Sequence, residues 1–176
     1  MTLAFLSPSR CAEGTLASPL RRALQHADPE VVRDLSLQGV VEVRGDVDSA
    51  SPAPGEELVR LSPRRGFLFT NGDAAEAAER VRAAGALAYD ATGALAGIAI
   101  RSEQALRRLT DLDLERLPAA GPFARVPALV LRGDDGWFRV YVQQELGHYV
   151  AEAVLDALRG LGSDPTGLTP SEKTAC

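Results

Sequence analysis

Alternation of apolar and polar residues predicts several short strands. Val41 and Val43 alternate with Glu42 and Arg44, which is the period of a half-buried strand. Other short apolar runs predict strands at residues 67–69, 86–89, 95–100, 128–131 and 138–142. The connection Gly-Asp-Asp-Gly at 133–136 is typical of a β-hairpin, so the last two strands are expected to pair antiparallel.

Helical spacing of apolar residues predicts four helices, each with a local start signal or stop signal. Ser18 and Pro19 open a short first helix, Asp73 with Glu76 forms a capping-box pattern before the second, and Ser102 caps the third. The fourth covers about residues 145–159. The expected buried positions are Leu20, Leu24 and Ala27; Ala74, Ala77, Ala78, Val81 and Ala84; Ala105, Leu106 and Leu109; and Leu146, Val150, Val154, Leu158 and Leu161.

The order of these elements predicts an α+β protein. Strands and helices follow one another as in a ferredoxin-like split βαβ core, with an appended β-hairpin and a C-terminal helix. Residues 1–17 and 163–176 are rich in Ser, Thr, Gly and Pro and are expected to be flexible tails. We therefore expect one α+β domain over residues 18–162, with room for two lobes.

Composition excludes several classes of protein. The formal net charge of −5 argues against general binding to nucleic acid or to an anionic membrane surface. Lys173 is the only lysine, so an internal Schiff-base lysine or P-loop lysine is excluded. Cys11 and Cys176 lie near opposite ends, which argues against a structural disulfide. With no signal peptide and no membrane span in the pattern, we expect a cytoplasmic protein.

Few residues suit catalysis or metal binding. The two histidines, His26 and His148, have neither a histidine four residues away nor a neighbouring cysteine, so a zinc site is not expected. His148 lies at the start of the helix that follows a strand and could reach a cleft; the alternative is a capping or interface role. Gly93 and Gly97 have the wrong spacing for a dinucleotide loop and are interpreted as turn and close-packing positions. We expect no catalytic, cofactor-binding or metal-binding residue on this chain.

Other charged groups fit a solvated surface. Two carboxylate sets, Asp111, Asp113 and Glu115 and then Asp134 and Asp135, lack the glycine and terminal glutamate of a calcium loop. Three arginine pairs, Arg21 and Arg22, Arg64 and Arg65, and Arg107 and Arg108, could grip an anionic partner. Adjacent residues of a helix diverge by about 100°, so each pair also fits an ordinary surface.

Aromatic residues near the last strand are candidate partner contacts. Trp137 and Tyr141 alternate with Phe138, Val140 and Val142, so the strand has two faces able to pack. One interpretation is that the Trp137 face points outward into an interface; the other is that the terminal helix covers the hairpin. The candidate partner or ligand contacts are Trp137, Tyr141, His148 and Tyr149.

One segment carries a family resemblance. Residues 89–100, Tyr-Asp-Ala-Thr-Gly-Ala-Leu-Ala-Gly-Ile-Ala-Ile, resemble the strand–turn–strand motif D-x-T…L-x-I/V-x-G of the folate-dependent aminomethyltransferase fold, and especially the gamma subunit of heterotetrameric sarcosine oxidase. Agreeing pieces occur in order at residues 18–20, 36–45, 108–114, 138–142 and 147–150. The resemblance extends over about residues 18–160.

The resemblance implies a non-catalytic gamma-like subunit of an oxidase that demethylates sarcosine and passes the one-carbon unit to tetrahydrofolate. Its implied partners are large and small flavoprotein subunits, and flavins, NAD and tetrahydrofolate are implied elsewhere in the complex. The chain departs from catalytic aminomethyltransferases, because nothing in residues 46–57 matches their acidic catalytic residue. The cysteine-containing motif of the related iron–sulfur-assembly proteins is also missing. A free-standing folate or one-carbon binding module and a generic interaction domain remain as alternatives.

Overall fold

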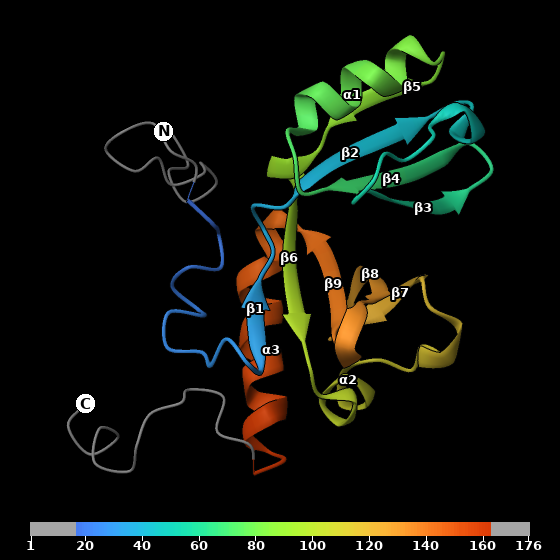
Figure 1. The fold of residues 1–176 in the computed structure, drawn as a ribbon. Helices are drawn as coiled ribbons and strands as arrows, with labels where there is room; N and C mark the ends of the chain where they lie inside the picture. The colour runs from blue at the N-terminus through green and yellow to red at the C-terminus, as the bar shows by residue number, and fades with distance from the viewer. Residues whose placement is uncertain (1–16, 163–176) are drawn as a thin grey trace, which may run out of the picture. The chain divides into compact units, whose positions relative to one another are not determined.

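The α+β prediction is confirmed. The computed structural model describes residues 17–162, which form two compact units, each with its own sheet (Figure 1). Unit 1 joins residues 17–36 to residues 96–162, and unit 2 is the intervening stretch 37–95. Residues 1–16 of the expected N-terminal tail and all of the expected C-terminal tail lie outside the described residues, together with Cys11, Lys173 and Cys176.

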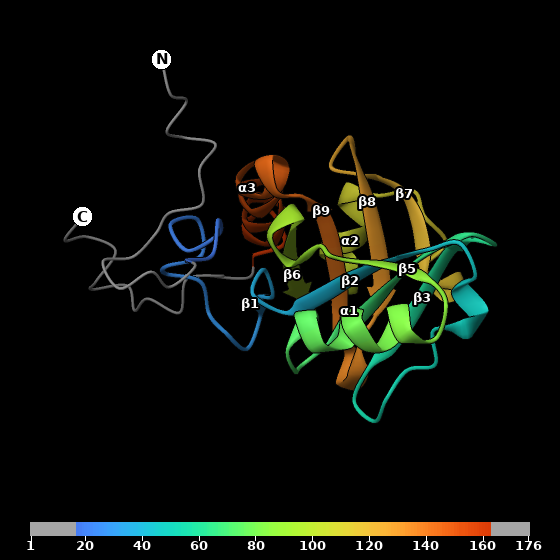
Figure 2. The ribbon, with the colours of Figure 1, turned by 90° about the horizontal axis from the view of Figure 1, so that it is seen from above.

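Unit 2 is a four-stranded antiparallel sheet with one helix. Its strand order is β3-β4-β2-β5. The bounds are β2 Gly39–Arg44, β3 Glu57–Ser62, β4 Arg65–Thr70, α1 Ala74–Ala83 and β5 Leu87–Asp90, with short 3-10 turns η2 Val47–Ser49 and η3 Thr92–Ala94. Figure 2 shows α1 lying across this sheet. Val41, Val43 and Leu68 pack with the alanines of α1 to form the core of the unit.

The helix α1 begins and ends where local chemistry predicted. The Asp73 side chain accepts a hydrogen bond from the Ala75 backbone N–H, at 2.7 Å, which caps the first turn. Gly85 follows the helix with a φ of +100°, a left-handed conformation that suits glycine. Four of the five expected positions are buried, but Ala84 is exposed because it is already the C-cap.

Unit 1 holds a five-stranded sheet covered by two helices. Its strand order is β1-β6-β9-β8-β7, and β8 pairs antiparallel with β9 as the hairpin pattern predicted. The bounds are β1 Val32–Asp34, β6 Leu95–Ile100, α2 Glu103–Leu109, η4 Leu114–Arg116, β7 Ala119–Phe123, β8 Val126–Arg132, η5 Asp134–Gly136, β9 Phe138–Gln143, η6 Gln144–Leu146 and α3 Gly147–Arg159. Ile98, Val130 and Val140 of the sheet join Val150 and Val154 of α3 in one core.

Two of the predicted helices in unit 1 are confirmed. Ser102 caps α2 by accepting a hydrogen bond from the Ala105 backbone N–H, at 3.2 Å. The predicted stripe of α3 is buried at Val150, Val154 and Leu158, whereas the expected end positions Leu146 and Leu161 are only partly buried. In the same way, Leu109 of α2 is only partly buried.

The helix predicted to open at Ser18 is wrong. Residues 19–26 form consecutive turns rather than an α-helix. Within them, the Leu24 backbone N–H donates a hydrogen bond of 2.9 Å to the Leu20 carbonyl. The Ala27 backbone N–H donates to the Leu24 carbonyl, three residues earlier. This is the spacing of a 3-10 turn and not of an α-helix. Leu20 is nevertheless buried, because it packs into the core of unit 1.

Three strands escaped the sequence pattern, and all three are edge strands. They are β1, β3 and β7, which end the two sheets. Edge strands tolerate residues that central strands do not, and β7 contains both Gly121 and Pro122. Their apolar alternation is therefore weak. Across residues 17–162, no helix combines the length and the apolar character needed to span a membrane.

Candidate functional site

The two strand aromatics are buried, so the outward-facing interpretation of Trp137 is wrong. Trp137 is 8% exposed, and the Arg33 guanidinium carbon lies 4.1 Å from the centre of its ring. Arg101 approaches the same ring at 5.8 Å. Tyr141 is buried too, with its ring against Gly97. The terminal helix does not cover this face, because α3 packs on the opposite one, with Phe138 and Val140. Trp137 is covered instead by Arg33 and Arg101 of the same unit.

His148 and Tyr149 are exposed in the first turn of α3, and each already contacts its own unit. His148 Nε2 lies 3.1 Å from Glu152 Oε1, one helical turn further on. The Tyr149 hydroxyl donates a hydrogen bond of 2.9 Å to the Ala124 carbonyl. A capping role for His148 is wrong, because Leu146 occupies the N-cap and makes no side-chain hydrogen bond. Both residues remain surface candidates.

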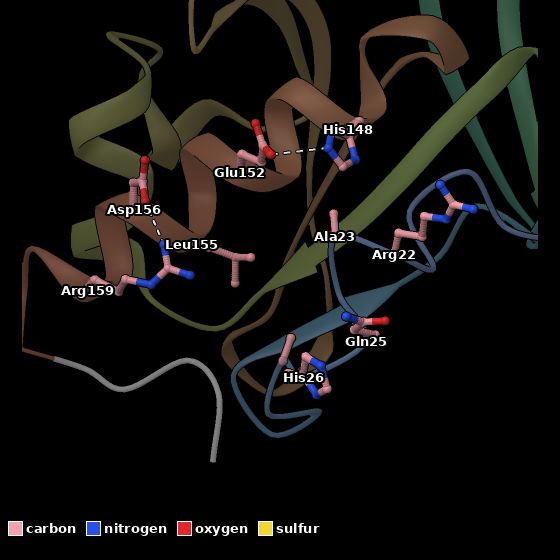
Figure 3. A pocket seen from close by; sticks show the side chains of 10 residues that line it. Arg22, Ala23, Gln25, His26, His148, Glu152, Leu155, Asp156 and Arg159 are labelled. Carbon is pink, nitrogen blue, oxygen red and sulfur yellow. Dashed lines mark hydrogen bonds and ion pairs between the residues drawn. The ribbon is translucent and has the colours of Figure 1, made fainter. Parts of the chain in front are cut away.

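A groove in unit 1 brings both histidines together. It has a volume of about 580 Å³ and lies between the turns of residues 22–27 and one side of α3 (Figure 3). His26 lies on the first wall and His148 on the second. Leu20 fixes the two walls, because a Cβ built on Gly147 would be only 2.9 Å from its Cδ2 atom. Nothing in the sequence pattern predicts this approach of residues far apart in the chain.

The charges on the α3 wall of this groove are already paired. Glu152 pairs with His148, and Asp156 lies 2.7 Å from Arg159 (Figure 3). Both pairs lie at the surface, with the Glu152 side chain 61% and the Asp156 side chain 75% exposed. Within residues 17–162, no three His, Cys, Asp or Glu side chains gather closely enough to hold a metal ion.

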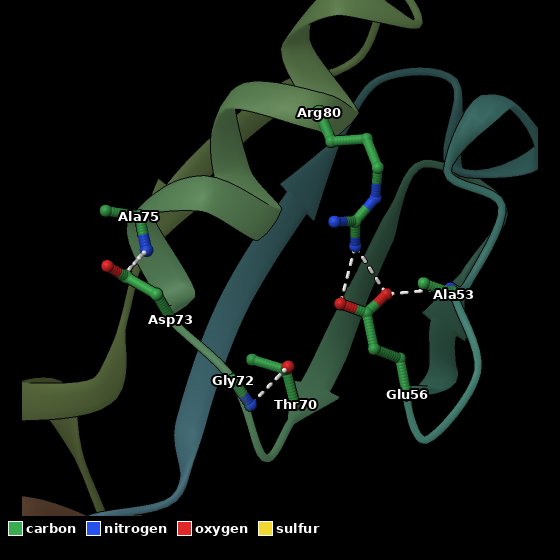
Figure 4. A network of polar contacts seen from close by, with 7 residues as sticks. All are labelled: Ala53, Glu56, Thr70, Gly72, Asp73, Ala75 and Arg80. Carbon is green, nitrogen blue, oxygen red and sulfur yellow. Dashed lines mark hydrogen bonds and ion pairs between the residues drawn. The ribbon is translucent and has the colours of Figure 1, made fainter.

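Unit 2 contains a buried carboxylate that the sequence did not reveal. The Glu56 side chain is 6% exposed and accepts hydrogen bonds from the Ala53 backbone N–H and from the Arg80 guanidinium (Figure 4). Burial tends to raise the pKa of Glu56, but hydrogen bonds from Ala53, Arg80 and Thr70 outweigh burial and hold the pKa below its ordinary value. Glu56 is thus an ionised carboxylate that ties the loop before β3 to α1.

The Glu56 carboxylate is poorly placed to act as a general acid. Glu56 lies within residues 46–57, where the sequence offered no match, yet its oxygens are occupied by Arg80 and Ala53. A carboxylate held ionised in this way is a poor proton donor near neutral pH. Its hydrogen bonds hold the loop before β3 against α1 and so stabilise unit 2. The sequence could not have revealed this contact, because it depends on α1 folding back over the loop.

Comparisons with known proteins identify a fold but no family. No family model matches the sequence, and no curated protein matches it. One solved structure with a similar fold is a chain of the heterotetrameric sarcosine oxidase from Corynebacterium sp. U-96, determined in complex with pyrrole 2-carboxylate. The TM-score is 0.72 and the identity 12%, over 84% of this chain and 96% of that chain.

A second structure is more distant. The regulatory subunit of aspartate kinase from Thermus thermophilus superposes with a TM-score of 0.45 and 15% identity, over 72% of this chain and 96% of that chain, and it carries no argument. The chain is thus α+β with the fold of a sarcosine oxidase chain.

Proposed function

We propose that this chain is a non-catalytic, gamma-like subunit of a hetero-oligomeric oxidase of the sarcosine oxidase type. The observation that carries the proposal is the fold match, which extends over 96% of a chain belonging to a heterotetramer. The order of the resembling segments in the sequence supports the same role. In this role the chain packs against the large flavoprotein subunit of a cytoplasmic complex that demethylates sarcosine.

The cofactors are proposed to bind on the other subunits. Flavins, NAD and tetrahydrofolate would be held by the large and small flavoprotein subunits, where the redox chemistry takes place. Supporting this, the buried Glu56 is engaged by Arg80, and His148 is engaged by Glu152. These side chains act within their own units, so the proposed contribution of this chain is structural.

Co-expression tests the proposal directly. The chain, carrying an affinity tag, is produced together with the large and small flavoprotein subunits of a sarcosine-oxidase-type enzyme from the same organism. We expect a complex that retains bound flavin and consumes oxygen when sarcosine is added. The proposal fails if the flavoprotein subunits assemble and oxidise sarcosine while this chain purifies alone.

The isolated chain provides the second arm of the test. We expect it to be colourless and to show no heat of binding with tetrahydrofolate in titration calorimetry. Stoichiometric tetrahydrofolate binding by the isolated chain would favour the free-standing folate-binding alternative.

A further inference from the structure

The bend between β4 and α1 contains the only asparagine in the sequence. Asn71 and Gly72 stand between Thr70, the last residue of β4, and Asp73, the N-cap of α1. Both are exposed, and neither belongs to a helix or a strand. In an exposed Asn-Gly pair the backbone can react with the asparagine side chain, because glycine has no Cβ to hinder the approach.

The reaction is an intramolecular acyl transfer, favoured because the two reacting groups are neighbours in one chain. The Gly72 backbone nitrogen gives its proton to hydroxide and attacks Cγ of Asn71. The new N–Cγ bond closes a five-membered succinimide ring, the Cγ–Nδ2 bond breaks, and the side-chain nitrogen takes up a proton and leaves as ammonia. Water then opens the ring at either carbonyl, which gives aspartate or isoaspartate. The net change consumes one water and needs no oxidant or reductant.

The surroundings of Gly72 leave this attack open. Among the described residues, a Cβ built on Gly72 would meet only Thr70 Oγ1, at 3.4 Å. Two hydrogen bonds involve the reacting groups: the Gly72 N–H donates to Thr70 Oγ1 at 2.9 Å (Figure 4), and Gln38 Nε2 donates to Asn71 Oδ1 at 3.4 Å. The second bond is long and exposed, so the first is the main restraint. Breaking one such bond slows the attack by about tenfold.

We propose that Asn71 is a site of spontaneous modification, at which attack by Gly72 converts the asparagine into aspartate and isoaspartate. Every other side-chain amide in the sequence belongs to a glutamine, which would have to close a six-membered ring and reacts far more slowly. The inference goes beyond the proposed function and does not depend on it, because it needs only the bend of unit 2.

The two products differ in their effect on α1. Aspartate at position 71 leaves the main chain unchanged and brings a negative charge near the N-terminus of the helix, where the helix dipole favours it. Isoaspartate instead runs the main chain through the former side chain. The main chain is then longer by one methylene group before Gly72.

The bend has no room for the longer main chain. A Cβ built on Gly39 would lie 3.1 Å from the Gly72 carbonyl oxygen and 2.7 Å from Thr70 Cγ2, so the bend packs directly on the start of β2. Asp73, which caps α1 by accepting a hydrogen bond from the Ala75 N–H, follows at once. Isoaspartate should therefore move Gly72 off Gly39 and weaken the cap.

The experiment follows the purified chain during incubation at physiological temperature and mildly alkaline pH. Trypsin, which cuts after Arg65 and Arg80, releases the bend in the peptide 66–80. Liquid chromatography with mass spectrometry separates the asparagine, aspartate and isoaspartate forms of this peptide. A synthetic peptide of the same sequence gives the rate without the fold.

Two variants isolate the reacting groups. Asn71→Gln lengthens the ring that has to close, and Gly72→Ala places a methyl group beside the attacking nitrogen. The bend accommodates this methyl group, because its one close contact, Thr70 Oγ1, is at ordinary van der Waals distance. Circular dichroism melts verify that both variants fold.

We expect both products to accumulate in the folded wild type at no less than about one tenth of the rate in the synthetic peptide, since one hydrogen bond has to open. Isoaspartate should be the more abundant product, because the main-chain carbonyl of the ring is the more electrophilic. Both variants should convert several-fold more slowly. Amide hydrogen exchange at Ala75 should be faster in the incubated wild type than in Asn71→Gln incubated alongside.

Failure of any of these expectations overturns a stated part of the inference. A folded chain that stays unmodified while the synthetic peptide converts would show that the bend blocks the attack. Equal conversion in Gly72→Ala, or aspartate without isoaspartate, would assign the product to direct hydrolysis by water. Unchanged exchange at Ala75 in a converted chain would remove the effect on α1.

Discussion

The ring of Tyr141 lies directly against Gly97 in the sheet of unit 1. A Cβ built on Gly97 would stand 2.7 Å from the tyrosine Cε1 atom and 3.0 Å from the Leu35 Cβ. β6 and β9 are neighbours in the sheet, so the missing side chain of one strand makes room for the ring on the other. This confirms that Gly97 is a close-packing glycine.

Gly97→Ala should therefore destabilise the protein. The added methyl group would force the Tyr141 ring or the strand to shift, and overpacking of this kind costs about 1–3 kcal/mol. The free energy of unfolding in urea measures the effect. Gly93→Ala is the matched control, because a Cβ there meets nothing within 4 Å. Equal stabilities for the two variants would contradict the close-packing explanation.

Trp137→Ala should act mainly on stability. The ring is buried beneath Arg33 and Arg101, so its removal leaves a cavity and two arginines without their aromatic partner. Large-to-small changes of this kind cost about 3–5 kcal/mol. Thermal and urea unfolding followed by far-ultraviolet circular dichroism will show the loss. Tyr89→Ala is the control, because Tyr89 is an exposed aromatic and its removal should cost far less stability. If Trp137→Ala unfolds at the same temperature as the wild type, Trp137 is not a core residue and becomes a candidate partner contact again.

Glu56→Gln should lower stability near neutral pH and lose most of its effect in acid. The folded state lowers the pKa of Glu56, so the ionised carboxylate stabilises the protein above its ordinary pKa of 4.5. That contribution is lost as the pH falls below 4.5 through the folded-state pKa. Removing the charge of a buried, hydrogen-bonded group costs about 1–3 kcal/mol.

Urea unfolding of wild type and Glu56→Gln across this pH range provides the measurement. The difference between the two proteins should shrink as the wild-type carboxylate becomes protonated. Glu79→Gln serves as control, because Glu79 is exposed and pairs with Arg82 on the surface of α1, where such a pair contributes about 0–1 kcal/mol. A difference that stays constant from neutral to acid pH would show that the Arg80 pair is not the cause.

Arg125→Gly should stabilise the turn between β7 and β8. Ala124 and Arg125 have φ values of 47° and 69°, a left-handed conformation that costs a residue with a side chain about 1–2 kcal/mol. Glycine removes this cost but gains freedom in the unfolded chain, so we expect a net gain of about 0.5–1 kcal/mol. Arg125→Ala removes the same charge without relieving φ, and it should not stabilise. A gain of equal size in both variants would assign the effect to charge.

Local signals in the sequence determined the elements whose ends are set by their own residues. Asp73 and Ser102 cap helices through neighbouring backbone N–H groups, so their positions were predictable without any long-range contact. The stripe Val150, Val154 and Leu158 determined the buried side of α3 in the same way, because its spacing is the period of the helix. The hairpin of β8 and β9 needs only its four-residue connection.

Tertiary structure decided everything that depends on a distant partner. The pattern around Trp137 shows two packing faces, but burial of the indole depends on Arg33 and Arg101, which come from other segments. The same is true of Glu56, since the sequence cannot show that Arg80 will reach its carboxylate. Side-chain period determines which face a residue occupies, whereas the long-range fold determines what covers that face.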